Sequence, residues 1–445
     1  MQKIACCIVF IFSLSKIIGQ SKAQEIDELL KAYSNQNSFN GSALIAQKGK
    51  VLLEKGYGYK NAAANIFNDA NTIFQIGSIT KQFTSTIILR LQEQGKISVH
   101  DKLSKYIPDY PDGDSISIEN LLTHSSGIHN FNDEAFMKNN ASKPMKLDSI
   151  ILLFRNAPLD FKPGTNYNYS NSNYILLGFI IEKITGKSYY QNVREKIFLP
   201  LHMFHSGFNF SALKNADKAI GYSRLNKKHQ NIASIVDSSI MYAAGGIYST
   251  IEDLYKWDQA LYTDKIINDS SKQKAFKSYK NNYGYGWMID SAYGKKALMH
   301  EGATLGFTSF IGRIPEDSIC IILLDNKQSN GLIKIAEDIN SILNDQPYDF
   351  PRPRNEIDVD ASILKQYVGV YQLSPEINLT ISLEDEQLFI QIPAQEKTQL
   401  FAEKENYFFV KLSDVEIEFP KNSIGQITKL IFHQNGQEIS ALKIK

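Results

Sequence analysis

The spacing of apolar residues changes at one place in the chain. Upstream, residues 41–59 and 306–326 have the alternation and β-branched content of strands, and the segments between them have helical spacing. This order predicts an α+β domain whose sheet joins the two ends of the upstream part. The change falls at residues 344–360, NDQPYDFPRPRNEIDVD, where three prolines and several charges interrupt both patterns, so we interpret this segment as a linker.

Downstream of the linker the apolar period is two. Residues 379–383, 388–392 and 415–419 (LTISL, LFIQI and VEIEF) alternate apolar with polar positions. The pattern predicts a small antiparallel β domain over residues 361–445.

One upstream helix is predicted to begin at Ser78. An apolar residue recurs every four positions from Ile79 to Leu91, and Gly95 supplies the stop, which together predict a helix of about five turns. Ser78 and Lys81 fall on the other side of this helix, one above the other at its N-terminal end. Their side chains can therefore touch.

The first 23 residues have the composition of a secretory signal. A lysine precedes an apolar run from Ile4 to Phe12, and residues 21–23 (Ser-Lys-Ala) include the small residues that signal peptidase prefers. The run is about half of the ~20 residues that span a bilayer. We therefore expect cleavage after residue 23, no membrane span in the mature chain, and a periplasmic or extracellular location.

Cleavage would leave some 420 residues, enough for two domains, with Cys320 as the single cysteine. One cysteine forms no disulfide within the chain, so packing must stabilise the exported protein. Loss of Lys3, Lys16 and Lys22 changes 48 basic against 47 acidic residues to 45 against 47, a formal net charge of about −2. Because a near-neutral chain lacks the positive surface that nucleic acid requires, we expect no nucleic-acid partner.

Ser78 and Lys81 form one of six serine-x-x-lysine pairs in the chain, so the spacing alone assigns no chemistry. One alternative is that Ser78 caps the helix and Lys81 is a solvated charge. Against it, a lysine in the first turn opposes the helix dipole, and the preceding FQIG is too apolar for an exposed turn. A lysine buried there would lose its proton and could deprotonate a serine hydroxyl. We therefore predict that Lys81 is buried and substantially neutral.

A tyrosine could supply a second proton-transfer group. Five tyrosines stand two residues before an asparagine, and the context selects Tyr169 with Asn171. A Pro-Gly turn precedes this pair and a long apolar helical run follows it, which fixes the loop against buried structure.

A third candidate is the His-Glu-Gly sequence at residues 300–302, which we expect to open an edge strand. The glycine there would let a substrate approach the strand backbone closely. The next amide, that of Ala303, could pair with the amide of Ser78 as an oxyanion hole.

With these motifs in this order, the chain resembles the penicillin-recognising serine hydrolases. They include class C β-lactamases, D-alanyl-D-alanine carboxypeptidases and related esterases and D-amino-acid peptidases. The resemblance covers about residues 24 to 340 and implies a β-lactamase/transpeptidase-like domain over residues 24–343, in which an antiparallel sheet is flanked by helices and joined by an all-helical subdomain. The tail, with YVGVYQL, looks like the small β-barrel appendage of many such proteins. Further similar segments are LLTHSSGI (121–128), AAGGIYSTIEDLYKW (243–257), YGYGWMI (283–289) and HEGATLGF (300–307).

The resemblance also implies roles for individual residues. Ser78 would be the acyl-enzyme nucleophile, Lys81 and Tyr169 the acid/base pair, Asn171 a contact to substrate and lysine, and His300 with Gly302 the wall of the cleft.

Other chemistries have less support in the sequence. There is no Gly-x-Ser-x-Gly motif of α/β-hydrolases and no H-E-x-x-H motif. We interpret His124, His129, His202 and His205 as structural, and expect no metal and no cofactor. Glu301 would point to the opposite face of its strand from the neighbouring histidine, so a serine-histidine-acid triad is not expected.

Histidine at position 300 departs from the lysine of most β-lactamases. With an ordinary pKa near 6.5 it is only about one quarter charged at pH 7, which makes a weak anchor for a substrate carboxylate. We therefore expect a small-molecule or peptide substrate, namely an ester or a small D-amino-acid peptide. A β-lactamase or D-alanyl-D-alanine carboxypeptidase is the first alternative, and a non-hydrolytic penicillin-binding or sensing module is the second. The sequence leaves the oligomeric state open.

Overall fold

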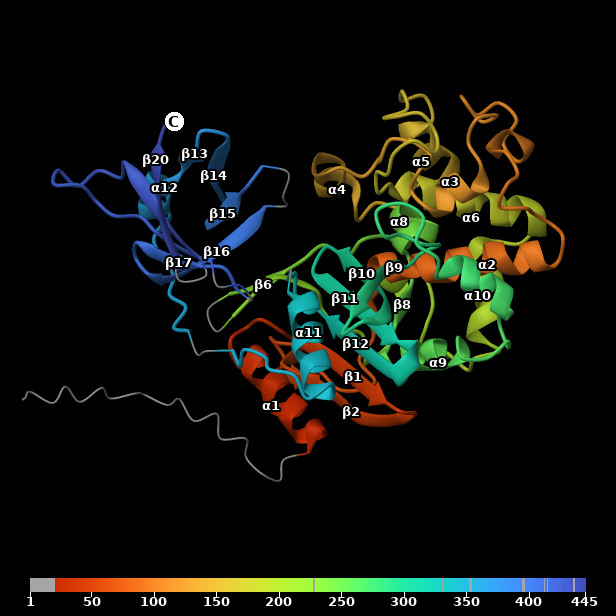
Figure 1. The fold of residues 1–445 in the computed structure, drawn as a ribbon, viewed down its shortest axis with the longest axis horizontal. Coiled ribbons are helices and arrows are strands. Elements are labelled where there is room, and N and C mark those ends of the chain that lie inside the picture. Colours follow the sequence, from red (N-terminus) through yellow and green to blue (C-terminus); the bar gives the residue numbers. More distant parts are fainter. Residues whose placement is uncertain are drawn as a thin grey trace, which may run out of the picture.

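The protein consists of an α+β domain and a smaller β domain that lies to one side of it (Figure 1). The coordinates are a computed structural model. The structure describes residues 21–445 apart from residues 227–228, 330, 352–353, 394–396, 412, 414 and 435–436.

Six antiparallel strands form the sheet of the α+β domain, in the order β2-β1-β12-β11-β10-β9. Strand β1 pairs with β12 from Gly41 opposite Asp325 to Ala46 opposite Cys320. The prediction that the sheet joins the two ends of this domain is therefore confirmed. The strand bounds are β1 Gly41–Gln47, β2 Lys50–Tyr57, β9 Met288–Ala292, β10 Lys295–Thr304, β11 Phe307–Ile314 and β12 Ile319–Asp325.

Helices cover both faces of this sheet. On one face α1 (Lys22–Asn35) and α11 (Leu332–Leu343) pack against inward side chains such as Ile45 and Leu323. On the other face Leu44 and its neighbours on β12 pack against the helical region. Burial on both faces explains why β11 and β12 are buried at every position and why β12 is a nearly continuous apolar run.

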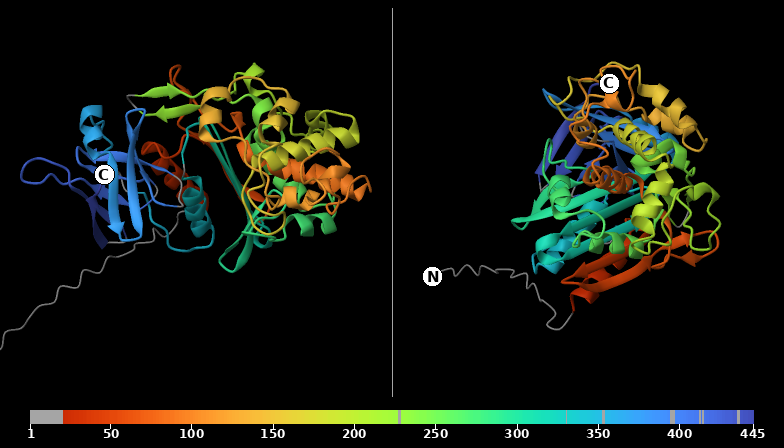
Figure 2. Two further views of the ribbon diagram at one scale, coloured as in Figure 1. Left: turned by 90° about the horizontal axis from the view of Figure 1, so that it is seen from above. Right: turned by 90° about the vertical axis from the view of Figure 1, so that its right-hand side faces the viewer.

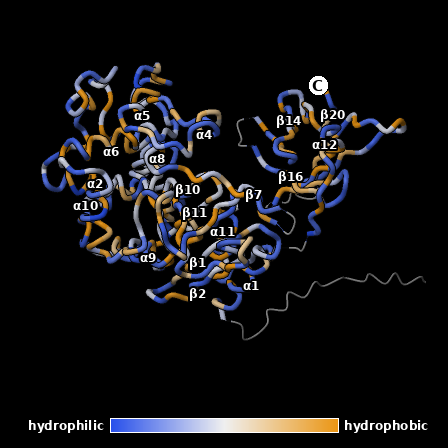
Figure 3. The backbone as a smooth tube through the Cα atoms, turned by 180° about the vertical axis from the view of Figure 1, so that it is seen from behind, coloured by the Kyte–Doolittle hydropathy of each residue, from blue (hydrophilic) through white to orange (hydrophobic). Residues whose placement is uncertain are grey.

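The helical region is built around α2 (Thr80–Glu93) and α6 (Asn171–Thr185). Most of α6 is buried, and Figure 3 shows it as a largely hydrophobic segment among polar loops. A helix that is apolar on all sides belongs in an interior, where neighbouring helices surround it. The other helices of this domain are α3 Ile118–Leu122, α4 Glu134–Asn140, α5 Leu147–Phe154, α7 Tyr189–Val193, α8 Ser238–Gly245, α9 Ile251–Ala260 and α10 Asp269–Ala275.

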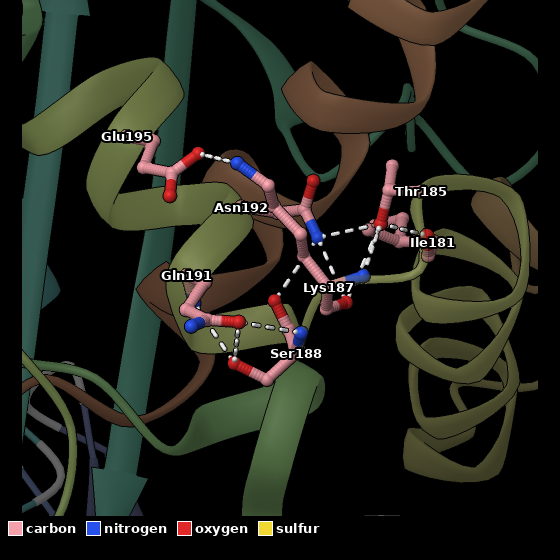
Figure 4. A network of polar contacts seen from close by, with 7 residues as sticks. All are labelled: Ile181, Thr185, Lys187, Ser188, Gln191, Asn192 and Glu195. Carbon is pink, nitrogen blue, oxygen red and sulfur yellow. Dashed lines mark hydrogen bonds and ion pairs between the residues drawn. The ribbon is translucent and has the colours of Figure 1, made fainter.

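A network of side-chain hydrogen bonds fixes the turn between α6 and α7 (Figure 4). The buried Asn192 Nδ2 donates to Thr185 Oγ1 at 2.8 Å and to two carbonyl oxygens of the turn. Helix α7 thereby places Tyr189, whose hydroxyl lies 2.6 Å from Thr84 Oγ1 on α2. The turn thus holds two elements that pack directly on α2.

The C-terminal domain is a closed barrel of eight antiparallel strands. Helix α12 (Ala361–Tyr367) precedes it and contributes Leu364 and Tyr367 to the barrel core. The three alternating segments of the sequence coincide with β14, β15 and β18, so the predicted antiparallel β domain is confirmed. The strand bounds are β13 Gly369–Ser374, β14 Ile377–Glu384, β15 Gln387–Gln391, β16 Thr398–Lys404, β17 Tyr407–Phe409, β18 Glu416–Glu418, β19 Lys429–Gln434 and β20 Gln437–Lys443.

The segment between α11 and α12 connects the two domains and is held by ion pairs. Asp358 accepts from Arg224 at 2.9 Å, and Glu356 pairs with Lys411 of the barrel domain at 2.7 Å. Arg224 belongs to a hairpin of β6 (Tyr222–Leu225) and β7 (Gln230–Ile232), which extends toward the barrel in Figure 2. These pairs join the linker to both domains.

The expected signal segment lies mostly outside the described residues, which begin at Ser21. Ser21 caps α1 by accepting from the amide of Gln24, and Lys22 Nζ donates to Leu343 O at 2.6 Å. The expected cleavage point after residue 23 therefore falls within the first turn of α1. In the part of the chain that the structure describes, no helix has the length and apolar character needed to cross a membrane.

Candidate active site

Ser78 lies in a single 3₁₀ turn, Gly77–Ile79, directly before α2. The predicted helix therefore begins two residues later than expected, at Thr80. Gly77 has a φ of 48°, and a Cβ on it would lie 2.7 Å from the amide nitrogen of Ala303. Only glycine fits this close approach, which places the Ala303 amide beside the residue that precedes Ser78. Ser78 makes no capping hydrogen bond, which argues against the N-cap alternative.

Lys81 is completely buried, and its Nζ lies within hydrogen-bonding distance of three uncharged groups. These are Asn171 Oδ1 at 2.7 Å, Ala244 O at 2.8 Å and Ser78 Oγ at 3.0 Å. The two carbonyl oxygens can only accept, whereas the serine hydroxyl can also donate. A neutral amine satisfies the whole set, because it donates two hydrogens to the carbonyls and accepts the hydroxyl proton on its lone pair. That hydroxyl proton is the one a base must remove.

Burial lowers the pKa of Lys81 well below its ordinary value. Burial disfavours a charged amine, and none of its three hydrogen-bonding partners is a carboxylate that would restore the charge. Rings of Tyr169 and Tyr174 lie 4.8 and 5.4 Å from Nζ, so the surroundings of the amine are largely aromatic. The neutral amine is the form that can accept a proton.

The carbonyl of Ala244 is a part of the site that the sequence did not single out. It is exposed to Lys81 because Tyr242, inside α8, has non-helical φ and ψ of 36° and −122°. This kink interrupts the helix, and the carbonyls of Ala243 and Ala244 instead accept from Thr84 and Lys81 on α2. The segment belongs to the AAGG motif, whose similarity to the family was the available signal.

Tyr169 lies over Lys81 and interacts with the hydroxyl of Ser78. Burial raises the pKa of the Tyr169 phenol, although the hydrogen bond to Ser78 works in the opposite direction. The phenol therefore keeps its proton at neutral pH. In this state Tyr169 is a proton donor, and Lys81 is the group able to accept the serine proton.

Asn171 is held from two sides at the start of α6. Its backbone N–H donates to Asn130 Oδ1 at 2.8 Å, and its side-chain Nδ2 donates to Asn132 Oδ1 at 2.9 Å. These contacts turn Oδ1 toward Lys81. The structure thus brings Ser78 and Lys81 together with Tyr169 and Asn171, although 90 positions separate Lys81 from Asn171 in the sequence.

The expectation that His300 begins its strand was wrong, but His300 does begin the part of the strand that lies at the edge of the sheet. It lies in the middle of β10, which begins at Lys295 because a turn with positive φ at Tyr293 and Gly294 folds β9 back onto it. Pairing between β9 and β10 ends at Met299. Within the described strands, the half of β10 from His300 onward is therefore paired only with β11, and it is this half that faces Ser78.

Gly302 is required for a different reason than expected. A Cβ there would lie 2.0 Å from the carbonyl oxygen of Ile76 and 2.4 Å from Ser309 Oγ. Glycine lets β10 approach the chain just before Ser78, rather than letting a substrate approach the strand. Together with the contact at Gly77, this packing sets the separation between the Ser78 and Ala303 amides.

His300 is neutral rather than one quarter charged. Burial lowers its pKa to about 3. Its Nδ1–H donates to Glu301 O at 2.6 Å, so its Nε2 accepts from the Tyr283 hydroxyl at 2.9 Å. At neutral pH the histidine therefore contributes no positive charge to the site.

His124 and His129, which we interpret from the sequence as structural, have different surroundings. His129 pairs with Asp160 at 3.0 Å, while the His124 ring lies among tyrosine rings. Over the described ranges, no three His, Cys, Asp or Glu side chains form a metal-binding group.

A neutral Lys81 predicts a distinctive pH dependence of stability. Its pKa is lowered in the folded state, so between that value and about 10.5 the unfolded chain binds one more proton than the folded chain. Wild type should therefore gain stability relative to Lys81→Met as the pH rises through this window, by up to about 1.4 kcal/mol per pH unit. Urea unfolding of both proteins at several pH values measures the difference. A constant difference would mean that Lys81 is charged in the folded protein.

The sheet, the all-helical region and the serine-lysine-tyrosine cluster between them define a β-lactamase/transpeptidase-like protein of the serine hydrolase superfamily. The family model described as Beta-lactamase matches residues 26–340, and the chain belongs to this family. Residues 353–442 match a second model, described as a domain of unknown function, DUF3471.

Individual relatives agree with this assignment. Penicillin-binding protein 4* of Bacillus subtilis (strain 168) is 28% identical over 96% of this chain and 100% of its own length. A teichoic acid D-alanine hydrolase of Staphylococcus aureus (strain MRSA252) is 31% identical over 74% of this chain and 79% of its own. A solved octameric penicillin-binding protein homologue from Pyrococcus abyssi is 25% identical, with a TM-score of 0.66, and covers 94% of this chain and 99% of that one.

Proposed function

We propose that this serine hydrolase acts through an acyl-enzyme on Ser78, and that its substrates are esters or small D-amino-acid peptides. The observation that carries the proposal is the contact between Ser78 Oγ and the buried Lys81 amine at 3.0 Å. A serine becomes a strong nucleophile only when a base accepts its proton, and here the base is placed to do so.

The remaining groups complete the reaction. As Ser78 Oγ bonds to the substrate carbonyl carbon, its proton passes to Lys81 Nζ, and the amides of Ser78 and Ala303 stabilise the carbonyl oxygen as it becomes negative. The leaving alcohol or amine takes the proton of Tyr169, and the tyrosine recovers a proton from Lys81. Water then attacks the acyl-enzyme by the same steps in reverse order and restores Ser78.

The electrostatics of the site favour substrates without an essential carboxylate. His300 is neutral and its ring nitrogens are already bonded to Tyr283 and Glu301. A β-lactam or a D-alanyl-D-alanine peptide, which carries a carboxylate, would find a weak anchor there. The 31% identical relative whose name refers to teichoic acid D-alanine hydrolysis supports a D-alanyl ester as a member of the substrate class.

The test is a turnover assay of the purified protein with four substrates: an aryl ester, a D-alanyl ester, a D-alanyl dipeptide and a chromogenic cephalosporin. The proposal expects one of the two esters or the D-alanyl dipeptide to have the highest kcat/KM. Preference for the cephalosporin would instead favour a β-lactamase. A burst of acylation without turnover would favour a sensing module.

His300→Lys is expected to change selectivity rather than only activity. A lysine would place a cation where a neutral ring now lies, so kcat/KM for carboxylate-bearing substrates should rise about tenfold relative to neutral esters, equivalent to ~1.4 kcal/mol. The ratio of the two kcat/KM values is the measurement. His300→Gln, which stays neutral, is the matched control and should leave the ratio unchanged. An unchanged ratio in the lysine variant would show that position 300 does not contact the substrate carboxylate.

We further propose that the protein is exported. The apolar N-terminal segment supports this location, and the capping of α1 by Ser21 favours a cut just before that residue over one after residue 23. N-terminal sequencing of the protein recovered outside the cytoplasm distinguishes the two positions. Recovery of the uncut chain in the cytoplasm would contradict export.

A further inference from the structure

His124 is attached to both neighbours of Tyr169. Its carbonyl oxygen accepts from the amide of Asn168 at 3.1 Å, and its ring Nδ1 accepts from the amide of Ser170 at 3.2 Å. The two rings themselves lie with their centroids 4.3 Å apart. One residue thus holds the backbone on either side of the proton-transfer tyrosine and also packs against its ring.

The backbone of His124 is unusual for a histidine. Helix α3 ends at Leu122, and the amides of His124 and Ser125 bond back to the carbonyls of Leu121 and Asn120, at 3.4 and 2.9 Å. These two bonds form a Schellman motif, in which the left-handed position is usually glycine. His124 occupies that position with a φ of 53°. A side chain kept at an energetic cost in a position suited to glycine suggests that the side chain itself is needed.

The protonation state of His124 follows from its contacts. A backbone amide can only donate, so Nδ1 is the unprotonated nitrogen and the proton lies on Nε2. Burial lowers the pKa of the ring, which is therefore neutral. Nε2 is enclosed by the rings of Tyr169, Tyr174 and Tyr283 and has no hydrogen-bond partner in the described part of the chain.

The residues that follow His124 hold the rest of the same loop. The carbonyl of Ser125 accepts from the amide of Gly164 at 2.7 Å, and that of Gly127 accepts from the amide of Asp160 at 2.8 Å. Asn130 then binds the amide of Asn171. The segment LLTHSSGI, which is similar to the family, and Asn130 after it therefore hold the loop that carries Tyr169 by hydrogen bonds at several points along the loop.

We propose that His124 is a positioning residue that holds the Tyr169 phenol between Ser78 and Lys81. It does so through the two flanking amides and the ring contact, and its unprotonated Nδ1 is the essential atom. The inference rests on the proposed role of Tyr169 and adds a requirement that the three sequence motifs do not contain. Loss of the Nδ1 contact would let the phenol move, and a displacement of about 1 Å at a reacting group can cost about 100-fold in rate.

Two substitutions tolerate the left-handed backbone at position 124. They therefore distinguish the effect of losing the side-chain contact from the effect of disturbing the fold. His124→Gly keeps the Schellman motif and removes the acceptor, whereas His124→Asn tolerates the same φ and offers its Oδ1 in place of Nδ1. We expect the acylation rate with a fluorophosphonate, and kcat for an ester, to fall about 10- to 100-fold in His124→Gly with KM changed less than about threefold. His124→Asn should recover most of the loss. Wild-type rates in His124→Gly, or equal losses in both variants, would overturn the proposal.

Thr123→Val is the matched control, because Thr123 is buried in the same turn but its hydroxyl bonds to Glu119 O and Ser125 Oγ instead of the amides beside Tyr169 or the His124 ring. Its rate should stay within about twofold of wild type at a similar loss of Tm. An equally slow Thr123→Val would overturn the proposal in favour of general loosening of the turn.

A measurement on the wild-type protein is independent of whether the variants fold. In ¹⁵N-histidine-labelled protein, His124 should show an unprotonated Nδ1, a protonated Nε2 and no titration between pH 5.5 and 8. A protonated Nδ1 or a titrating ring would overturn the proposal. Failure of wild type to label with fluorophosphonate would remove the proposed role of Ser78, whereas normal labelling with unaffected His124→Gly removes only the role of His124.

Discussion

Ser78→Ala is expected to abolish both turnover and covalent labelling, with kcat/KM for the best substrate reduced about 10⁴- to 10⁶-fold. Alanine removes the atom that forms the acyl bond, while the amides of Ser78 and Ala303 and the shape of the cleft remain. The residual rate would be that of direct attack by water in a site that still stabilises the oxyanion. Labelling with a fluorescent fluorophosphonate, followed by peptide mapping of the wild-type adduct, makes the measurement and identifies the labelled residue.

The matched control for this prediction is Ser362→Ala. Ser362 and Lys365 have the same serine-x-x-lysine spacing and also lie in a first helical turn, but on the exposed surface of α12 in the barrel domain. Because burial and the partners of the lysine create the reactivity, Ser362→Ala should label and turn over as wild type does. Equal labelling of wild type and Ser78→Ala would assign the nucleophile elsewhere.

The contrast between these two serines shows what the sequence could predict. The serine-x-x-lysine spacing alone left six candidate pairs. Ser78 was selected because an apolar helical pattern follows it and because the tyrosine and histidine motifs occur later in the chain. Periodicity also suggested a helix with one polar side, yet Gln82 and Ser85 on that side are fully buried. Gln82 Oε1 accepts from Trp257 Nε1 at 3.0 Å, a long-range contact that no local pattern reveals, and Ser85 Oγ donates to the carbonyl of Gln82 in the same helix.

The charge of His300 illustrates the same limit. Its residue type gives an ordinary pKa, but the protonation state depends on burial beside Lys81 and on Tyr283, 17 residues away. The carbonyl of Ala244 and the kink at Tyr242 cannot be predicted from residue type either, since any residue supplies a carbonyl, and only the resemblance of the AAGG segment to the family pointed to this region. In the barrel, β17 has only three residues, too few for a period of two to be recognised in isolation. The motifs therefore locate the reacting groups, and tertiary contacts determine their ionisation.

Lys81→Met is expected to lower kcat/KM about 10³- to 10⁴-fold, because the substitution removes the proton acceptor and keeps a chain of similar length and volume. Only Ser78→Ala should have a larger effect. In wild type, kcat/KM should rise with pH through one deprotonation that reports the lowered pKa of Lys81, since only the neutral amine accepts the serine proton. In Lys81→Met this inflection should disappear. The pH profiles of kcat/KM for a neutral ester, compared between the two proteins, provide the measurement.

Lys81→Arg distinguishes a base from a group that only orients Ser78. A guanidinium can donate to Asn171 Oδ1 and Ala244 O as the lysine does, but it keeps its proton at every pH of interest. If Lys81 acts as the base, the arginine variant should be as slow as the methionine variant despite its hydrogen bonds. Substantial activity in Lys81→Arg would mean that the amine only positions the serine, and that Tyr169 must then accept the proton as a phenolate. The raised pKa of the Tyr169 phenol argues against that route, because forming the phenolate in this buried site would itself be unfavourable.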